Sequence, residues 1–213
     1  EQIPTTRIDT LTADSTKERK YRDRYLGEAY FMRGYYYFRL ARMFGGMPLI
    51  DFVVKSSNEW AQKRATLDET MKFIIDDFTH AENLLWLKDK YSDEELGRAT
   101  KGAAQAMLLK AYLYRADYLR NAGDETEAQK CFAEAAKWGK KVITSRQYSL
   151  CPDYFDNFRL AKENGQESVF EIQYTEDPTS DYGGEGYTRG TMTTILQRSR
   201  SSAFGEAGWG YNR

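Results

Sequence analysis

Residues 28–49, EAYFMRGYYYFRLARMFGGMPL, decide the fold of this chain. With the residues before it, this stretch predicts a helix from about Lys17 to Phe44, which ends at Gly45-Gly46 and is kept from resuming by Pro48. One set of apolar residues recurs at intervals of four and three and so shares a helical face: Tyr25, Ala29, Met32, Tyr36, Leu40 and Met43. Phe31, Tyr35 and Phe38 supply a second face. A helix that is apolar on two sides is expected to be sandwiched between neighbours.

Three more helices are predicted downstream of the glycine pair, after a long connection over residues 45–65 that includes Trp60. The second helix opens at Thr66-Leu-Asp-Glu69, which has the pattern of a capping box. Its apolar residues line one face, at Leu67, Met71, Ile74, Phe78, Ala81 and Leu85. The third helix is predicted from about Thr100 to Tyr118 and the fourth from about Glu125 to Thr144.

The second and fourth helices share a residue spacing. Ile74-x3-Phe78-x2-Ala81 in the second matches Ala128-x3-Phe132-x2-Ala135 in the fourth. This is the spacing of the second helix in a tetratricopeptide-like hairpin, where a small residue lets two helices approach closely. We therefore expect two stacked helical hairpins. An ordinary antiparallel bundle of four helices is the alternative.

The sequence changes in character after Tyr148. Phe170, Ile172 and Tyr174 alternate with polar residues and predict a small strand. From Asp177 onward the chain is rich in Gly, Ser, Thr and aromatic residues, which predicts a long loop-rich region. The predicted fold class is mainly α, with a helical-hairpin scaffold over residues 1–150. Residues 151–213 are expected to begin a loop-rich region that faces a ligand or a partner.

The composition excludes several classes of partner. The 213 residues include 31 basic and 32 acidic side chains, a net charge of −1, which argues against a surface for nucleic acid. No stretch approaches the roughly 18 apolar residues of a membrane-spanning helix. The sequence leaves open a lipid anchor upstream of residue 1. The sequence starts at Glu1 with no apolar leader, so we expect either a removed leader or an internal piece of a longer protein.

Few residues suit catalysis. The single histidine, His80, falls within the second helix and is interpreted as structural. Cys131 and Cys151 have no zinc-site spacing with a histidine, and a disulfide between them is not expected. Side chains of the adjacent Asp76-Asp77 point about 100° apart on a helix and are interpreted as solvated. We predict no catalytic residue, metal or cofactor. An enzyme acting on glycans through two distant carboxylates stays open as an alternative.

The opening stretch resembles the signature of the SusD/RagB family. In that family a helix with Glu-Ala, Arg-Ala/Gly and Tyr-Tyr-Phe ends in a Tyr/Phe-Gly-Gly-x-Pro-Leu turn, as residues 28–49 do. Further resemblances follow in the family's order: residues 74–78 (IIDDF), 111–114 (AYLY), 135–150 and 164–174 (NGQESVFEIQY). Together they extend over nearly the whole chain.

The resemblance implies a lipid-anchored, surface-exposed protein of the Bacteroidetes outer membrane. Such proteins bind glycans, or in some members peptides, and serve a SusC-like TonB-dependent transporter. They are binding proteins and not enzymes. Family chains are considerably longer than 213 residues, so the resemblance also implies that this chain is a fragment. A helical-repeat scaffold for protein interactions is the alternative function.

Loop aromatic residues are the predicted ligand contacts. An aromatic ring can cover the flat C–H face of a sugar, while amides, guanidinium groups and carboxylates bind its hydroxyls. The aromatic residues at 35–38 keep helical spacing and are expected to pack in the core. The candidate ligand-binding set is Tyr182, Tyr187, Trp209 and Tyr211, with Arg189, Asn212 and Gln173 as polar partners.

Overall fold

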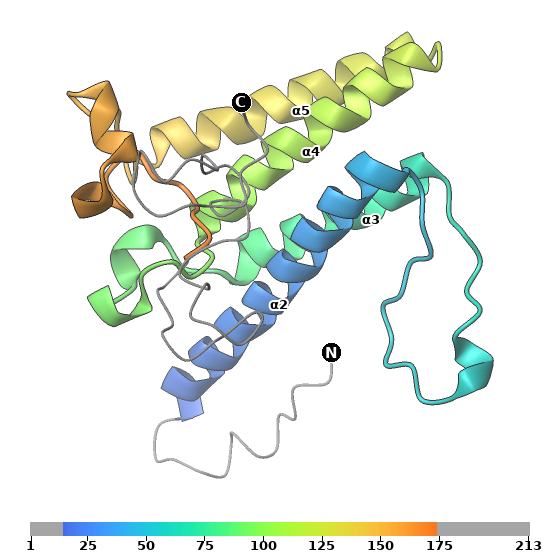
Figure 1. The fold of residues 1–213 in the computed structure, drawn as a ribbon, viewed down its shortest axis with the longest axis horizontal. Coiled ribbons are helices and arrows are strands. Elements are labelled where there is room, and N and C mark those ends of the chain that lie inside the picture. The colour runs from blue at the N-terminus through green and yellow to red at the C-terminus, as the bar shows by residue number, and fades with distance from the viewer. Residues whose placement is uncertain (1–14, 174–213) are drawn as a thin grey trace, which may run out of the picture. The chain divides into compact units, whose positions relative to one another are not determined.

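The computed structural model describes residues 15–173, which contain four α-helices (Figure 1). These are α2 (Ser15–Phe44), α3 (Leu67–Leu84), α4 (Lys101–Asn121) and α5 (Glu125–Thr144). Short 3₁₀ helices lie in the connections: η1 (Ser57–Glu59), η2 (Lys88–Lys90), η3 (Asp93–Glu95), η4 (Tyr154–Phe158) and η5 (Leu160–Lys162). A first compact unit runs to Glu171, and the contacts below are within it. The predicted domain boundary after residue 150 stays a prediction.

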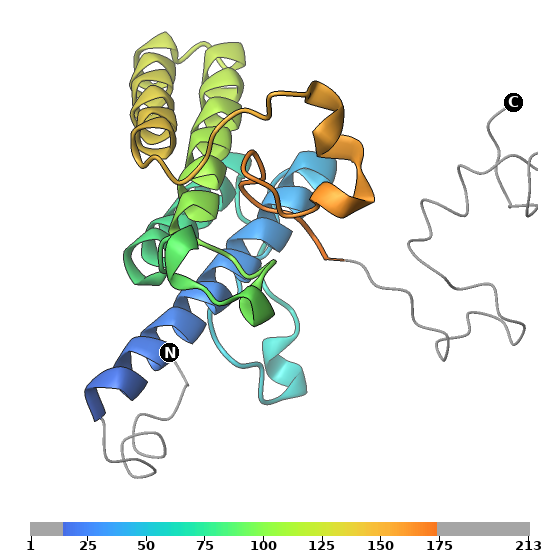
Figure 2. The same cartoon turned by 90° about the vertical axis from the view of Figure 1, so that its left-hand side faces the viewer.

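The helices pair as two hairpins. In Figures 1 and 2, α2 runs antiparallel to α3, and α4 runs antiparallel to α5. Helix α3 also packs against α4 and so joins the two hairpins. The shared spacing lies at these contacts, because Ile74, Phe78, Ala81, Ala128 and Ala135 are all buried. This confirms the predicted mainly helical, tetratricopeptide-like arrangement.

Helix caps explain where α3 and α5 begin. At α3 the Glu69 amide donates to the Thr66 hydroxyl (3.2 Å), and the Thr66 amide donates to the Glu69 carboxylate (2.8 Å). This is the capping box that the sequence predicts. Asp124 caps α5 in the same way, by accepting from the Glu127 amide (3.1 Å).

None of the helices between residues 15 and 173 is both long and apolar enough to cross a membrane.

The glycine pair forms a tight crossing between the end of α2 and the start of α3. Gly45 has a φ of +76°, which a side chain would strain. Gly46 lies so close to the Ala65 carbonyl oxygen that a Cβ there would overlap it. The Arg64 guanidinium closes the crossing by donating to the carbonyls of Gly46 (2.7 Å) and Phe44 (2.6 Å). The 45–65 connection therefore starts and ends at one fixed point.

Only one face of α2 is buried. Phe31, Phe38 and Ala41 lie in the core against α3. The face predicted from the fours-and-threes spacing is exposed instead: Tyr25, Ala29, Met32, Tyr36, Leu40 and Met43. Within residues 15–173 the main neighbour of α2 is α3, with a minor contact from α4, so nothing described lies on its outer side. Within the described residues α2 therefore has one covered side, and the expectation of a second neighbour stays a prediction.

The segment around Phe170 is not a strand in the described residues. Its backbone makes turn bonds, such as that from the Ser168 amide to the Gly165 carbonyl (3.2 Å). A strand needs a neighbour to complete its hydrogen-bond ladder, and residues 15–173 provide none. The Phe170 ring instead packs on Phe31 (4.9 Å between centroids) and Tyr35 (5.9 Å). Ile172, the next residue of the alternating set, is 44% exposed, so the alternation does not mark a buried face here.

Arg24 ties the first half of α2 to the connection after α3. The residue is fully buried. Its guanidinium carbon lies 4.6–5.4 Å from four ring centroids, those of Tyr21, Tyr25, Trp86 and Tyr91. It also pairs with Glu95 (2.7 Å) and Glu28 (3.5 Å). These contacts combine a charge pair with cation–π interactions.

Asp77 overturns the expectation that both residues of the Asp76-Asp77 pair are solvated. Asp76 is exposed, but Asp77 is buried between α3 and α2. Arg33 donates to both Asp77 oxygens, from Nε (2.9 Å) and Nη2 (2.6 Å). Burial raises the pKa of Asp77, and the Arg33 guanidinium opposes that rise. The helical spacing of the sequence cannot show that the Asp77 carboxylate faces inward and pairs with a residue on another helix.

Candidate functional site

The predicted ligand contacts lie outside the described residues. This applies to all of Tyr182, Tyr187, Arg189, Trp209, Tyr211 and Asn212. Gln173 is the last described residue. The prediction for this set therefore stays a prediction.

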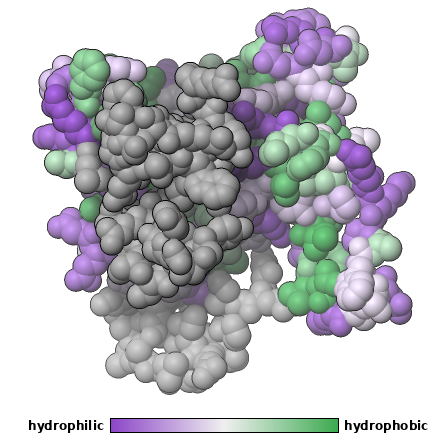
Figure 3. Space-filling model, viewed as in Figure 1, coloured by the Kyte–Doolittle hydropathy of each residue, from purple (hydrophilic) through white to green (hydrophobic). Residues whose placement is uncertain are grey.

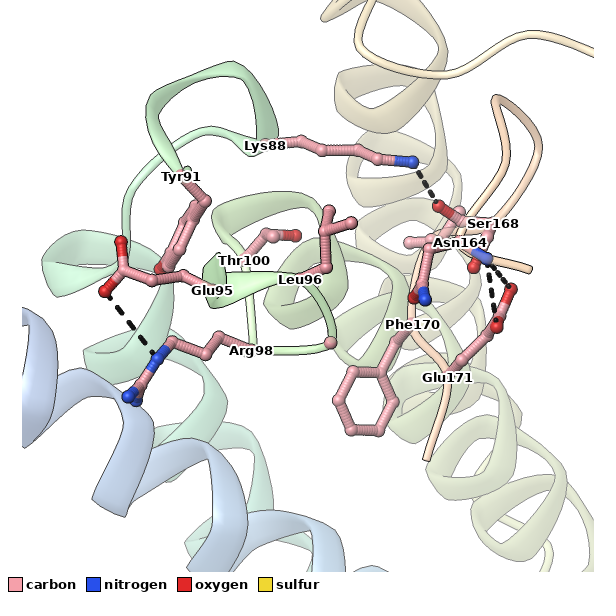
Figure 4. A pocket seen from close by; sticks show the side chains of 12 residues that line it. Lys88, Tyr91, Glu95, Leu96, Arg98, Thr100, Asn164, Ser168, Phe170 and Glu171 are labelled. Atoms are coloured by element: carbon pink, nitrogen blue, oxygen red, sulfur yellow. Dashed lines mark hydrogen bonds and ion pairs between the residues drawn. The ribbon is translucent and has the colours of Figure 1, made fainter. Parts of the chain in front are cut away.

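A small pocket lies between the connection after α3 and the segment at 164–171 (Figure 4). It is lined from one side by residues such as Lys88, Tyr91 and Leu96, and from the other by Asn164 and Phe170. Its volume is about 40 Å³. Sites for small-molecule ligands usually measure roughly 300–1,000 Å³, so this pocket is too small for a sugar.

Lys88 holds the two sides of the pocket together. Its ammonium group donates to the carbonyls of Gly165 (2.8 Å) and Ser168 (3.0 Å) and lies over the Tyr148 ring (5.3 Å). Burial lowers the pKa of Lys88, and the nearby Glu171 carboxylate opposes that effect. The ammonium is already bound to protein carbonyls, which favours a structural role over a chemical one.

Tyr91 lines the pocket, and Tyr148 contacts two of its lining residues, Lys88 and Thr100. The Tyr148 hydroxyl lies 2.9 Å from the Thr100 hydroxyl, and its ring occupies space that a side chain at Gly102 would fill. The Tyr91 hydroxyl donates to the Ala99 carbonyl (2.9 Å). Burial raises the pKa of Tyr91 to about 12, so its phenol stays neutral near pH 7. The pocket is therefore a packed joint between two segments.

The residues considered for catalysis have structural surroundings. The His80 ring stacks on Tyr30 (4.8 Å), and its Nδ1 lies 2.9 Å from the Asp76 carbonyl. Both cysteines are free thiols, and Cys131 is buried with its sulfur 3.1 Å from the Arg115 guanidinium. In the described part of the chain, no group of three His, Cys, Asp or Glu residues is arranged to hold a metal ion.

The 45–65 connection is the most conspicuous surface feature for ligand contact. It projects from the end of the α2–α3 hairpin, and Figure 3 shows hydrophobic residues gathered at that edge. The Trp60 side chain is 74% exposed. The other two tryptophans of the described region, Trp86 and Trp138, lie largely within the fold. Trp60 is thus an indole with no evident packing role among residues 15–173.

The Trp60 loop is braced although its tip is exposed. Glu59 accepts from the Lys55 amide (2.7 Å), and its carbonyl accepts from the Gln62 side chain (2.7 Å). At the base, the Tyr37 hydroxyl accepts from the Ile50 amide (2.9 Å). The sequence places Trp60 in this connection, but the predicted ligand contacts do not include it. The sequence feature that points to Trp60 is a tryptophan among polar neighbours in a long loop.

Comparisons with known proteins agree on one family. The sequence model of a SusD-like family, described as starch-binding and associating with the outer membrane, matches residues 5–113. SusD-like protein P2 of Formosa agariphila is 30% identical over 184 residues, which are 85% of this chain and 33% of that protein. A SusD-like protein of Bacteroides ovatus is 29% identical over 203 residues, which are 95% of this chain and 34% of that protein.

A solved structure shows the same helical arrangement. A SusD homolog from Bacteroides thetaiotaomicron matches with a TM-score of 0.65 and 26% identity, over 80% of this chain and 31% of its own. The chain thus spans about a third of the length of the relatives that it matches.

Proposed function

This chain belongs to the SusD-like family, and we propose that it binds glycans at the cell surface without converting them. In this proposal a lipid anchor outside the chain holds the protein at the outer membrane. The bound glycan passes to a SusC-like TonB-dependent transporter. The description of the family as starch-binding and associated with the outer membrane supports the ligand class and the location. The transporter partnership rests on the resemblance of residues 28–49 and the motifs that follow it.

The exposed indole of Trp60 is the observation that carries the proposal. Tryptophan offers a large flat apolar face, which matches the C–H face of a pyranose ring. At 74% exposure this face is open to a ligand. Gln62 and Glu59 lie within two residues of it and provide amide and carboxylate groups for sugar hydroxyls. An aromatic face beside hydroxyl-binding groups is the chemistry of a sugar contact.

The fixed base of the loop favours binding. Arg64 holds both ends of the connection through the carbonyls of Gly46 and Phe44. A loop that is already ordered loses less conformational entropy when a ligand binds, so more of the contact energy appears as affinity.

A protein-interaction scaffold is the second candidate, favoured by the exposed apolar face of α2. That face presents Tyr25, Met32 and Leu40 along the helix. A peptide ligand in place of a glycan is a related possibility. Both predict a protein or peptide partner that binds without glycan.

The test uses the full-length protein, first on a glycan array and then by titration calorimetry with the oligosaccharide that binds. Trp60→Ala is expected to weaken binding roughly tenfold, the equivalent of about 1.4 kcal/mol. Tyr36→Ala is the matched control, because it removes an exposed ring from α2 and should leave affinity unchanged. If the protein bound neither glycan nor peptide and did not copurify with a transporter, the proposed function would be abandoned.

A further inference from the structure

A second exposed aromatic cluster lies on η4, far along the chain from Trp60. Tyr154, Phe155 and Phe158 are 69%, 66% and 71% exposed. The Tyr154 ring lies 6.0 Å from Phe155 and 5.4 Å from Phe158, centroid to centroid. We call these three residues the Tyr154 platform. Its rings contact one another while most of their surface faces water, which is uncommon for large aromatic side chains.

Fixed carboxylates surround the Tyr154 platform. Arg159 holds Asp153 (3.1 Å) and Asp156 (2.5 Å). Glu167 accepts from the Cys151 amide (2.9 Å) and the Asn157 side chain (3.0 Å), and these hydrogen bonds lower the pKa of Glu167. Asp153 and Asp156 share the Arg159 guanidinium, and Glu167 adds a third carboxylate, so this rim is acidic. Carboxylate oxygens accept hydrogen bonds from hydroxyl groups and repel anions.

The size of the platform indicates what it can bind. An aromatic side chain buries about 150–250 Å² when fully covered, so three rings exposed by two thirds offer about 400 Å². A stable protein partner usually covers about 800 Å² on each side. A sugar ring, by contrast, needs one aromatic face and a few hydroxyl-binding groups. The cluster is therefore small for a protein interface and sufficient for a short stretch of glycan.

We propose that the Tyr154 platform is a second glycan contact, selective for neutral polysaccharide chains. The aromatic rings cover sugar faces, the acidic rim accepts from sugar hydroxyls, and the same rim disfavours uronate or sulfate groups. This inference rests on the proposed glycan-binding function and adds a second contact to it. Figure 1 shows η4 and the 45–65 connection on opposite sides of the helices.

Two separated contacts have a measurable consequence. A long chain can engage both, so the second contact forms at a high effective concentration and increases the overall affinity. A short oligosaccharide occupies one contact at a time. The contribution of the Tyr154 platform should therefore appear with polysaccharides and disappear with short fragments of the same glycan.

The experiment compares full-length wild type with the Tyr154→Ala/Phe158→Ala double variant, Trp60→Ala and the Tyr36→Ala control. Affinity gels contain starch, laminarin, xylan or polygalacturonate, and calorimetry uses short oligosaccharides of the polymer that binds. We expect the double variant to lose roughly tenfold or more in polysaccharide affinity and to keep wild-type affinity for the short oligosaccharide. Trp60→Ala should weaken both. Thermal unfolding by circular dichroism identifies any variant that fails to fold, and the single Tyr154→Ala and Phe158→Ala variants then replace it.

The outcomes separate the two proposals. Wild type that is retarded by no glycan contradicts the proposed function, and the platform inference with it. If the folded double variant binds a neutral polysaccharide as tightly as wild type does, the platform inference alone is overturned. Preferential binding of polygalacturonate over the neutral polymers refutes the assigned ligand class.

Discussion

Replacing Gly46 by alanine should weaken the crossing between α2 and α3 more than any other single-methyl addition to these turns. The added Cβ would overlap the Ala65 carbonyl oxygen and lie 2.7 Å from the Thr66 carbonyl carbon and 2.9 Å from the Leu67 nitrogen. These are backbone atoms, so no side-chain rotation relieves the overlap. The start of α3 has to move away from the end of α2.

The cost can be worked from the bonds that such a movement breaks. The Met47 amide donates to the Thr70 hydroxyl (3.3 Å), the Ala65 amide donates to the Met47 carbonyl (3.2 Å), and Arg64 donates to Gly46 (2.7 Å). Each hydrogen bond contributes about 1 kcal/mol net, so losing all three costs about 3 kcal/mol. For a chain of this size that lowers the unfolding temperature by roughly 6–12 °C.

The assay is thermal and urea unfolding, followed by circular dichroism at 222 nm. Gly123→Ala is the matched control, because Gly123 has a φ of +88° and no atom lies within 4 Å of the place that its added methyl group would take. It measures backbone strain alone, roughly 1 kcal/mol. A Gly46→Ala variant as stable as Gly123→Ala would refute the argument from the close backbone approach.

Three further predictions concern other parts of the fold. Leu108→Ala should cost about 2–5 kcal/mol in urea unfolding because Leu108 is fully buried, whereas Ile143→Ala, at 78% exposure, should cost almost nothing; equal costs would contradict the assigned core. Thr66→Ala should cost about 1 kcal/mol near pH 7. Hydrogen bonds from the Thr66 amide and hydroxyl hold the pKa of Glu69 below its ordinary 4.5, so the stabilisation by the carboxylate is present above pH 4.5 and is lost as the pH falls through the lower folded-state value. The cost of Thr66→Ala should therefore shrink in acid but not vanish, because the hydroxyl still accepts from the Glu69 amide; a cost independent of pH would contradict the hydrogen bond from the hydroxyl to the carboxylate. Lys88→Met should speed amide hydrogen exchange in the segment that Lys88 anchors, and unchanged exchange would rule out that anchoring role.

The helices could be predicted from sequence because their signals are local. Thr66 and Glu69 mark the start of α3 through a pair of hydrogen bonds within four residues. Asp124 marks the start of α5 by accepting one hydrogen bond from the Glu127 amide, and the predicted bounds of α5 are those observed. The pairing of hairpins followed from the repeated small-residue spacing, which the buried Ala81 and Ala135 bear out.

The errors arose where the answer depends on residues distant in the chain. The spacing of Tyr36 and Leu40 shows that they share a face, but it cannot show whether another element covers that face. Asp77 can be buried because Arg33 on α2 donates to its carboxylate. Phe170 alternates like a strand residue but packs against α2 as part of an extended segment.

The candidate site can be predicted from the sequence less well than the fold. Trp60 and Tyr154 are identified by the large exposed fraction of their side chains. Exposure depends on the whole fold, so no periodic pattern in the sequence predicts it. The aromatic residues selected from the sequence, such as Tyr182 and Trp209, lie beyond residue 173 and stay predictions.

The buried Arg24 has a consequence for how the protein responds to salinity. Dissolved ions weaken charge pairs that they can surround, such as the exposed Lys130–Glu127 pair on α5. The Arg24 guanidinium is enclosed by four rings and two carboxylates and has no contact with solvent. Its carboxylate partners Glu28 and Glu95 are only 19% and 23% exposed, so the link between α2 and the 86–95 connection should lose less strength with added salt than the exposed pair does. This joint should therefore respond to salinity less than the charge pairs on the surface of the fold do.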